Sequence, residues 1–317
     1  MNSNDSTKSP VHQPMWKLRA SIWASRMRTQ WKLFAEVRIG LVGISVIALF
    51  GGMAVLHPLL MKFVWDPNIY DPVTGFDFDI FVHPSPPSSG HWLGTDPIGR
   101  DILSQLMKGT QGAFVLGGVA ALVTIVVATT VGSVSAYFGR WVDAILMRAA
   151  DLVIMTPTVS FLVVLGALWD LSFWMLALII GLISGFGATA VVVKSQALTI
   201  TVKPYIEAAR GSGGSHFHVL RTHVIPNLMP LAFLYMMFTV TAAIFSEAVL
   251  SYFGIMNIRM SWGIMIHTAQ TGGYLLSGFQ YWWLLFPPGL SITLLAGSFY
   301  LVGRALDQVI NPRLRRR

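Results

Sequence analysis

Long apolar runs separated by polar segments organise this chain of 317 residues. A helix of about 20 apolar residues spans the roughly 30 Å hydrocarbon core of a bilayer. The pattern predicts six such helices, at residues 39–64, 111–138, 152–169, 171–193, 227–250 and 281–303. We therefore expect an all-α polytopic membrane protein.

Breaks in the apolar pattern predict bends. Pro58, next to His57, is expected to kink or end the first helix, and Pro157 to kink the third. The third and fourth runs are nearly continuous and predict a helical hairpin. Frequent glycines in residues 251–280 predict a re-entrant or surface-lying segment on the outer side rather than one continuous helix.

The first polar segment, residues 1–38, is basic and contains three spaced tryptophans. Spacings of seven and eight place Trp16, Trp23 and Trp31 on one face of a helix. Two interpretations stay open. The segment is either an amphipathic helix that contacts membrane lipid on the inner surface, or a basic flank that only sets orientation.

The second polar segment, residues 65–110, is rich in proline and aspartate and is predicted to lie outside the cytoplasm. A short interfacial helix is expected over residues 101–108. Asp96, Arg100 and Asp101 are expected to act through turn and helix-cap chemistry with a local ion pair.

Composition agrees with a membrane protein, because only 11% of residues are charged and 54% are hydrophobic. Soluble domains carry roughly 25% charged residues. The net charge of +8 does not require nucleic acid as a partner, since basic residues collect on the cytoplasmic flanks of membrane spans. The chain has no cysteine, which excludes disulfides, thiol catalysis and cysteine-ligated metals.

The basic residues also predict the orientation. If both termini, including the basic tail 304–317, lie in the cytoplasm, most of the 22 Lys and Arg residues lie inside. The four that remain outside are Lys62, Arg100, Lys108 and Arg259. This asymmetry is typical of the positive-inside rule.

One polar stretch between two apolar runs has the chemistry of a docking element. It reads KPYIEAARGSGGSHFHVLRTHVIPNLMP from residue 203. Proline in the first turn and the good helix formers of Glu-Ala-Ala-Arg predict a short helix over residues 204–210. Glycines 211, 213 and 214 then predict a turn, and a second helical piece is expected over 215–223. A helix–turn–helix outside the bilayer is a suitable shape for binding a partner.

Two details of this stretch carry further expectations. Glu207 and Arg210 are spaced to form an ion pair on the first helix. His216, His218 and His223 do not share one helical face and have no acidic companion, so we expect them on the docking surface rather than around a metal.

This stretch resembles the EAA loop of ATP-binding-cassette importer permeases, in the register of Glu207-Ala208-Ala209, Gly213 and Ile225-Pro226. Other motifs similar to that family occur in the same order over residues 39–317. They are GTDPIGRD, YFGRWVD, LSYFG, SWG, FPPGLSIT and NPRL. Together they resemble the second permease subunit of the dipeptide and oligopeptide (peptide/nickel) importers. The resemblance implies the type I importer fold, with a permease core over residues 111–303 and the coupling loop at 203–226.

The resemblance also implies partners and site residues. In that family the short helix of the loop fits a cleft on a cytoplasmic ATPase subunit. The implied assembly is a heterodimer with a homologous permease, two ATPase subunits that bind ATP and Mg, and an extracytoplasmic substrate-binding protein. This chain itself is expected to bind no cofactor and no metal. The residues implied in ATPase docking are Pro204, Tyr205, Glu207, Ala208, Ala209, Arg210, Gly213, Ser215 and His216.

Glu247 is the one acidic residue inside a predicted span, and such residues are functional candidates. We expect a structural or gating role for Glu247 and for Pro157. An ion-coupled secondary transporter would need paired acids or broken helices in the membrane, and a single glutamate gives that alternative little support.

Enzyme motifs are absent from the sequence. Neither GxxxxGK[ST], HExxH nor GxSxG occurs, so we expect a transport subunit whose ATP is hydrolysed by partner subunits. An intramembrane enzyme would need a catalytic pair within the spans, and none is visible. The predicted location is the inner (plasma) membrane. Peptides are the favoured cargo by resemblance, with nickel or oligosaccharides as alternatives.

Overall fold

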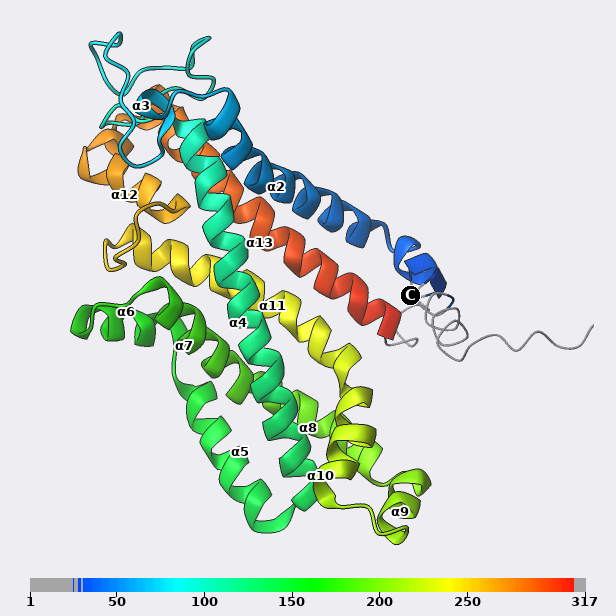
Figure 1. The fold of residues 1–317 in the computed structure, drawn as a ribbon. Coiled ribbons are helices and arrows are strands. Elements are labelled where there is room, and N and C mark those ends of the chain that lie inside the picture. The colour runs from blue at the N-terminus through cyan, green and yellow to red at the C-terminus, as the bar shows by residue number, and fades with distance from the viewer. Residues whose placement is uncertain (1–24, 26–27, 30, 311–317) are drawn as a thin grey trace, which may run out of the picture.

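A computed structural model describes residues 25, 28–29 and 31–310 of the chain. These residues form helices joined by loops (Figure 1). The elements are α2 (Arg38–Phe63), α3 (Pro67–Tyr70), α4 (Ile102–Phe138), α5 (Arg140–Met155), α6 (Thr158–Leu168), α7 (Phe173–Phe186), α8 (Ala188–Thr201), α9 (Pro204–Gly211), α10 (His216–Val219), the π-helical turn η1 (Leu220–Val224), α11 (Ile225–Tyr252), α12 (Trp262–Thr271), the 3-10 segment η2 (Tyr274–Tyr281) and α13 (Trp282–Ile310).

The number of spans depends on two bent helix pairs. Within the described residues, four stretches are long and apolar enough to cross a membrane: Arg38–Phe63, Ile102–Phe138, His216–Tyr252 and Tyr274–Ile310. The pairs α5–α6 and α7–α8 bend by 82° and 41°, and the count becomes six if each pair is one span. The predicted all-α, multi-pass architecture is therefore confirmed, and the predicted count of six is reached if each bent pair is one span.

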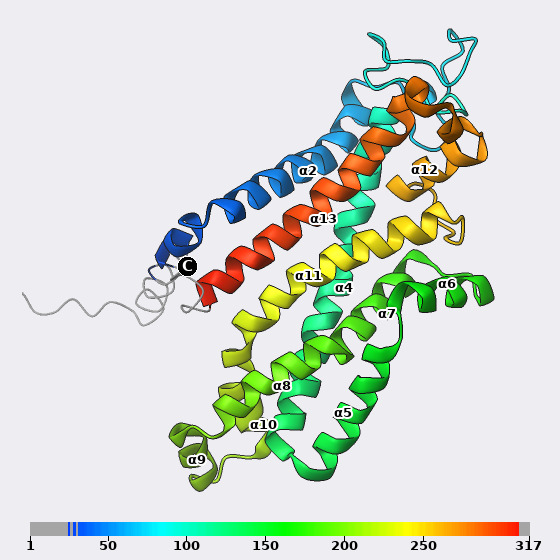
Figure 2. The ribbon, with the colours of Figure 1, turned by 180° about the vertical axis from the view of Figure 1, so that it is seen from behind.

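Helix α4 is the central element of the fold, and it corrects a prediction. A separate interfacial helix over 101–108 does not exist, because α4 runs unbroken from Ile102 to Phe138. At about 1.5 Å per residue, its 37 residues reach about 55 Å, well beyond the hydrocarbon core. It passes through the whole length of the molecule and packs against α2, α7, α8 and α11 (Figures 1 and 2).

The third and fourth spans also differ from the predictions. Residues 139–151 fall between two predicted spans, but most of them are helical and belong to α5, and Pro157 breaks the span sharply rather than kinking it. The missing N–H of proline removes a helix hydrogen bond, and its ring clashes with the preceding turn. The fourth span was expected as one helix and instead breaks at Gly187.

Other helix ends lie beyond their predicted positions. Pro58 does not end α2, which continues to Phe63. The fifth span begins at Ile225 directly after the π-helical turn, and α13 continues to Ile310, seven residues past the predicted end at residue 303. Apolar length alone underestimates helices that leave the hydrocarbon core, because their emerging turns are polar.

The segment 251–280 folds back against the ends of α4, α11 and α13 that lie opposite α9. This end of the molecule is called the outer end, because the charge pattern predicts that it faces outward. Helix α12 buries Trp262, whose Nε1 donates to the carbonyl oxygen of Leu106 in α4 at 3.0 Å. A Cβ on Gly263 would lie 2.5 Å from the carbonyl oxygen of Ala248, so glycine permits α12 to touch α11. Figure 1 shows α12 near α3, at the end of the molecule opposite α9.

The predicted tryptophan face lies mostly outside the described residues, which exclude Trp16 and Trp23. Trp31 is exposed and stacks on Phe34 with ring centroids 5.9 Å apart. Phe34 is buried against Val302 and Ala305 of α13. The described end of the basic segment is thus held against the last helix.

Candidate functional site

Helix α9 has one buried and one exposed face. Pro204 occupies its first turn, where a missing N–H costs nothing. Glu207 lies in the first turn and Arg210 in the last, which matches the helix dipole. Ile206 is fully buried, whereas Tyr205, Glu207 and Arg210 are exposed. The helix is anchored from one side and open on the other.

The turn after α9 depends on glycine at one position. Gly213 has φ +83°, a left-handed conformation that favours glycine. The Gly214 N–H donates to the carbonyl oxygen of Ala209 at 3.1 Å and closes the helix end. Ser215 then caps α10 by accepting from the N–H of His218 at 3.3 Å. The predicted helix–turn–helix is confirmed, but its second piece does not end at residue 223, because α10 continues through η1 into α11.

Tyr137, near the end of α4, holds the two short helices together. Its hydroxyl lies 2.9 Å from Nδ1 of His216 and accepts from Nε of Arg210 at 3.2 Å. The Arg210 guanidinium carbon lies 4.3 Å from the centre of the Tyr137 ring, a cation–π distance. The predicted pair between Glu207 and Arg210 is not among the ion pairs of the described residues, because Arg210 binds Tyr137 instead.

An apolar cluster connects this segment to three long helices. It consists of Ala128 of α4, Val193, Ala197 and Ile200 of α8, Ile206 of α9, Val219, Leu220 and Val224 of α10 and η1, and Leu228 of α11. Close-packed interiors transmit displacement because they have little free volume. Through this cluster, α9 is packed against α4, α8 and α11.

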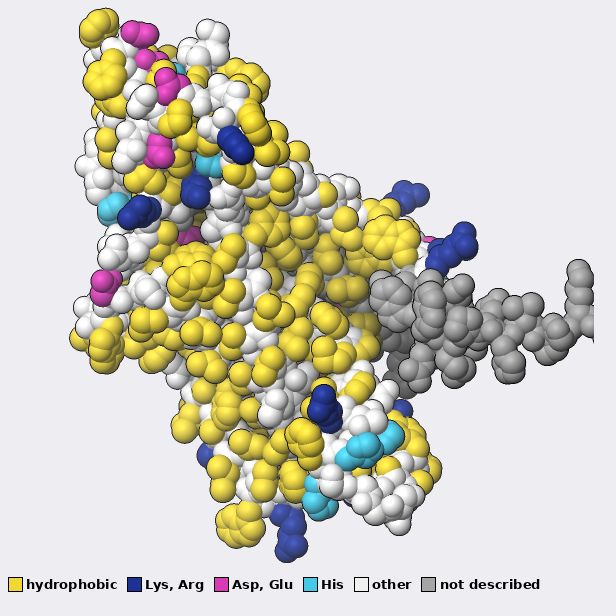
Figure 3. All heavy atoms as spheres, viewed as in Figure 1, with side chains coloured by type: hydrophobic (Ala, Val, Ile, Leu, Met, Phe, Trp, Pro, Cys, Tyr) yellow, Lys and Arg dark blue, Asp and Glu magenta, His cyan; other side chains and the backbone are white. Residues whose placement is uncertain are grey.

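The exposed side of the segment includes residues that the sequence analysis did not name. Phe217 of α10 is 71% exposed, between the exposed side chains of His216 and His218. The residues that hold the segment, Tyr137 and Ile206, were also missed. Tyr137 lies in the YFGRWVD motif, but its role depends on a contact far along the chain. Figure 3 shows a group of histidines at the lower end of the molecule, whereas most of the visible acidic side chains lie toward the opposite end, together with further histidines.

The outer end differs from the end that carries α9, because its charged side chains are buried. Arg100 and Asp96 form an ion pair at 2.5 Å, and both are buried. Gln105 donates to the same carboxylate at 3.0 Å. Asp101 caps α4 by accepting from the N–H of Ser104 at 2.6 Å. The predicted turn, cap and ion-pair roles of Asp96, Arg100 and Asp101 are confirmed.

His91 completes this outer network. Its Nδ1 lies 2.8 Å from Asp101 and its Nε2 lies 3.2 Å from Asp77. The hydrogen bond to the Asp101 carboxylate raises the pKa of His91 above its usual value, and the Asp77 bond adds to this against the effect of burial. A hydrogen bond from the Asp79 backbone N–H lowers the pKa of Asp77.

Glu247 lies in α11 near its outer end and is buried. Its Oε1 accepts a hydrogen bond from Ser251 at 2.5 Å. Gly263 of α12 packs closely against the Ser251 side chain. Glu247 therefore lies near the junction of α11 and α12. Its predicted structural or gating role stays a prediction.

The family model for the "Binding-protein-dependent transport system inner membrane component" matches residues 128–316. That range contains α9, α10 and the cluster that holds them. The chain belongs to this family. It is therefore a multi-pass component of the inner membrane.

Named relatives of this permease cover most of the chain. A putative peptide permease protein of Brucella suis is 30% identical over 83% of this chain and 86% of its own length. The dipeptide transport system permease protein of Bacillus subtilis is 29% identical over 90% and 85%. The oligopeptide transport system permease protein of the same organism is 30% identical over 95% and 92%. These relatives are named as permeases and not as ATPases.

Proposed function

We propose that this chain is the permease subunit of an ATP-driven, binding-protein-dependent importer of dipeptides or oligopeptides. The observation that carries the proposal is that α9 has one buried and one exposed face. One side is buried in a cluster with three long helices, and the other offers exposed side chains to a partner. Peptides are proposed as cargo because relatives that align over most of the chain are named for peptide transport.

In the proposed cycle, an ATPase subunit binds α9 and α10 from the cytoplasm. Closure of the ATPases on ATP and Mg pushes the segment, and the shared apolar cluster carries the movement into α4, α8 and α11. The spans then rock between inward-facing and outward-facing arrangements. Both termini and α9 lie in the cytoplasm, in keeping with the distribution of Lys and Arg.

The proposed assembly contains a homologous permease, two ATPase subunits and an extracytoplasmic binding protein. The binding protein delivers the peptide to the outer end, where α3, α12 and the buried ionic network lie. This chain supplies no ATPase chemistry of its own, and its role is to convert the ATPase movement into a change of access.

The docking step is tested by Glu207→Lys and Gly213→Asp in the purified complex. Glu207 is exposed, so reversing its charge disturbs the docking face without altering the core. An aspartate at the left-handed Gly213 strains the turn between the two helices. We expect normal membrane insertion, with ATP hydrolysis uncoupled from peptide uptake in proteoliposomes.

A matched control is Asp79→Lys, the same kind of charge reversal at an exposed residue of the outer end. It should leave co-purification of the ATPase unchanged. Normal coupled uptake in both docking variants would refute the docking proposal. Uptake that follows an ion gradient and ignores ATP would favour the secondary transporter instead.

A further inference from the structure

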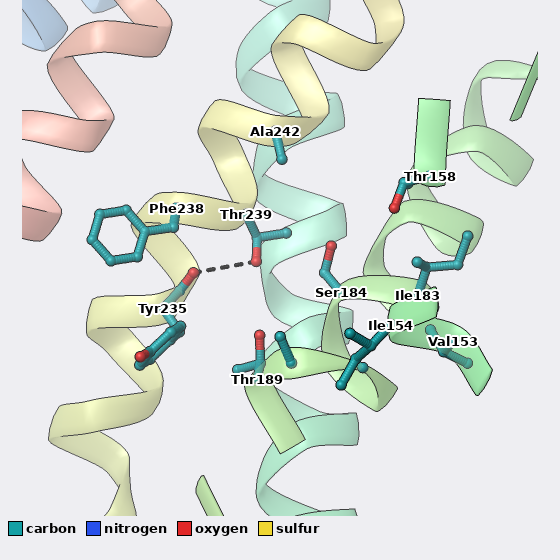
Figure 4. A pocket seen from close by; sticks show the side chains of 12 residues that line it. Val153, Ile154, Thr158, Ile183, Ser184, Thr189, Tyr235, Phe238, Thr239 and Ala242 are labelled. Carbon is teal, nitrogen blue, oxygen red and sulfur yellow. Dashed lines mark hydrogen bonds between the residues drawn. The ribbon is translucent and has the colours of Figure 1, made fainter. Parts of the chain in front are cut away.

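A cavity of about 290 Å³ lies where the two broken spans meet α11 (Figure 4). Its walls are the end of α5, the start of α6, the residues on both sides of the Gly187 break, and one face of α11. Thr239, which lines it, is midway along α11, so the cavity is at the middle depth of a span.

Four hydroxyl groups converge on this cavity, from Thr158, Ser184, Thr189 and Thr239. Figure 4 shows their oxygens around a common space. The Thr239 hydroxyl donates to the carbonyl oxygen of Tyr235 at 3.2 Å. The other three form no hydrogen bond with any residue that the structure describes, although the Thr189 side chain belongs to a residue only 7% exposed.

Most Ser and Thr hydroxyls on the described helices bond a carbonyl three or four residues earlier, as Thr110 does to Leu106 and Thr124 to Ala120, each at 2.9 Å. In a membrane such bonding is the ordinary way to satisfy a hydroxyl. Single hydroxyls without a bond occur elsewhere on these helices, for example at Ser160, but the three at this cavity lie together.

The helix breaks explain why two of these groups are free. Thr158 is the first residue of α6 and Thr189 the second of α8. The carbonyl four residues earlier belongs in each case to the preceding half-helix, which points away by 82° or 41°. The same breaks leave first-turn N–H groups of α6 and α8 and last-turn carbonyls of α5 and α7 near the cavity.

The lining thus offers hydrogen-bond donors and acceptors together, with no charged side chain among its residues. A ligand that matches it is neutral and carries both a donor and an acceptor. The main-chain amide of a peptide has this chemistry. Apolar walls from Val153, Ile154, Ile183 and Phe238 would accept side chains of varied shape.

We propose that this cavity binds main-chain amide groups of a peptide during its passage through the membrane. The proposal rests on the importer function proposed above. A second cavity of about 480 Å³ shares Tyr235 and Phe238 with the first and extends along α8, α11 and α13 to Arg304 and Asp307. The two cavities are therefore neighbours on α11, with Tyr235 and Phe238 in the wall of each.

The test measures uptake by the complete transporter, with its binding protein and ATPases, in proteoliposomes. The probes are a tetrapeptide and its analogue in which the central one of the three amides is replaced by an ester, which removes one N–H. Each is supplied at saturating concentration to the wild type and to a Thr189→Val, Ser184→Ala variant. The ester penalty is the uptake rate of the peptide divided by that of the ester. Because the binding protein is the same throughout, its own preference cancels when the penalty of the variant is compared with that of the wild type.

For the wild type we expect the ester to be taken up about two- to tenfold more slowly than the peptide, the value of one neutral hydrogen bond. In the double variant we expect the peptide itself to slow by a similar factor and the ester penalty to shrink toward one. Thr189→Ser, which keeps the hydroxyl, should restore the wild-type penalty. If the double variant fails to assemble, Ser184→Ala alone is the probe, at a position that is only half-buried.

The control is Thr110→Val, which removes a buried hydroxyl of a long helix outside the cavity. Its ester penalty should equal that of the wild type. An equal penalty in the double variant and the wild type would overturn the cavity proposal while leaving the importer intact. Failure of the wild type to transport peptide with ATP would instead overturn the proposed function, and the cavity proposal with it.

Discussion

The two ends of this permease differ in whether their polar residues are buried or exposed. At the outer end, Asp96 is paired with Arg100 and His91 with Asp101, and all four residues are buried. At the inner end, Glu207 and His218 are exposed, and Tyr137 binds the exposed residues Arg210 and His216. Internally satisfied charges stabilise a fixed shape, whereas exposed groups are available to a partner. The comparison predicts that substitutions damage stability at the outer end and coupling at the inner end.

The largest expected effect is that of Asp96→Ala. It leaves the Arg100 guanidinium buried without its carboxylate, a situation that costs roughly 3–5 kcal/mol. We expect a large loss of thermal stability in detergent-purified protein. Asp79→Ala, at an exposed acid in the same loop, is the control and should leave the melting temperature unchanged. Equal stability of the two variants would break the contrast.

Ile206→Ala should have the next largest effect, because Ile206 is the fully buried contact of α9. Removing a buried isoleucine side chain to Cβ costs about 3 kcal/mol. The loss should stay local and appear as faster amide hydrogen exchange in α9, with α4 unchanged. Glu207→Ala on the exposed face should leave the exchange of α9 as it is in the wild type.

Tyr137→Phe tests the clamp with a smaller change. It removes the hydroxyl that meets Arg210 and His216 but keeps the ring under the guanidinium. The expected cost is about 1 kcal/mol, the value of an ordinary hydrogen bond. We expect unchanged global stability and a lower ratio of peptide transported to ATP hydrolysed. A ratio equal to that of the wild type would show that the apolar cluster alone carries the coupling.

The smallest expected effect is a pH dependence of the outer end. The pKa of His91 is raised in the folded state, mainly by its hydrogen bond to Asp101. Its contribution is therefore complete below the unfolded pKa near 6.5 and is lost as pH rises through the higher folded value. Melting temperatures should fall across that range in the wild type more than in His91→Gln. Parallel curves for the two proteins would contradict this assignment.

The sequence predicted features that depend on nearby residues. The cap at Asp101, the Asp96–Arg100 pair and the short helix at Pro204 all follow from local chemistry. It did not predict the length of α4. The predicted span began at Gln111, where the long apolar run begins, and a hydropathy boundary is not a helix boundary. Nor did it find Tyr137 or the hydroxyl cavity, because their contacts join residues far apart in the chain.

The two span breaks, at Pro157 and Gly187, also show how far residue type predicts the fold. The sequence predicted a bend at Pro157 but none at Gly187, and the two breaks differ, at 82° and 41°. Before the second break, Gly181 and Gly185 of α7 are in close contact with α4. Proline disturbs a helix through its missing N–H, so its effect can be predicted from residue type, whereas a glycine in a span can mark either a break or a close helix contact.

The π-helical turn η1 has a consequence for how related chains can vary in length. A π-helical turn holds one residue more than an α-helical turn, and each residue of an α-helix advances the chain by about 100° around the axis. Deleting one residue from Leu220–Val224 would therefore convert η1 into an ordinary α-helical turn and leave α10 and α11 in nearly the same rotational phase. Deleting one residue from the α-helical part of α11 would instead rotate the docking face by about 100° relative to the rest of the span. Single-residue changes of length are consequently expected to be absorbed at η1 and not in the α-helical turns that follow it.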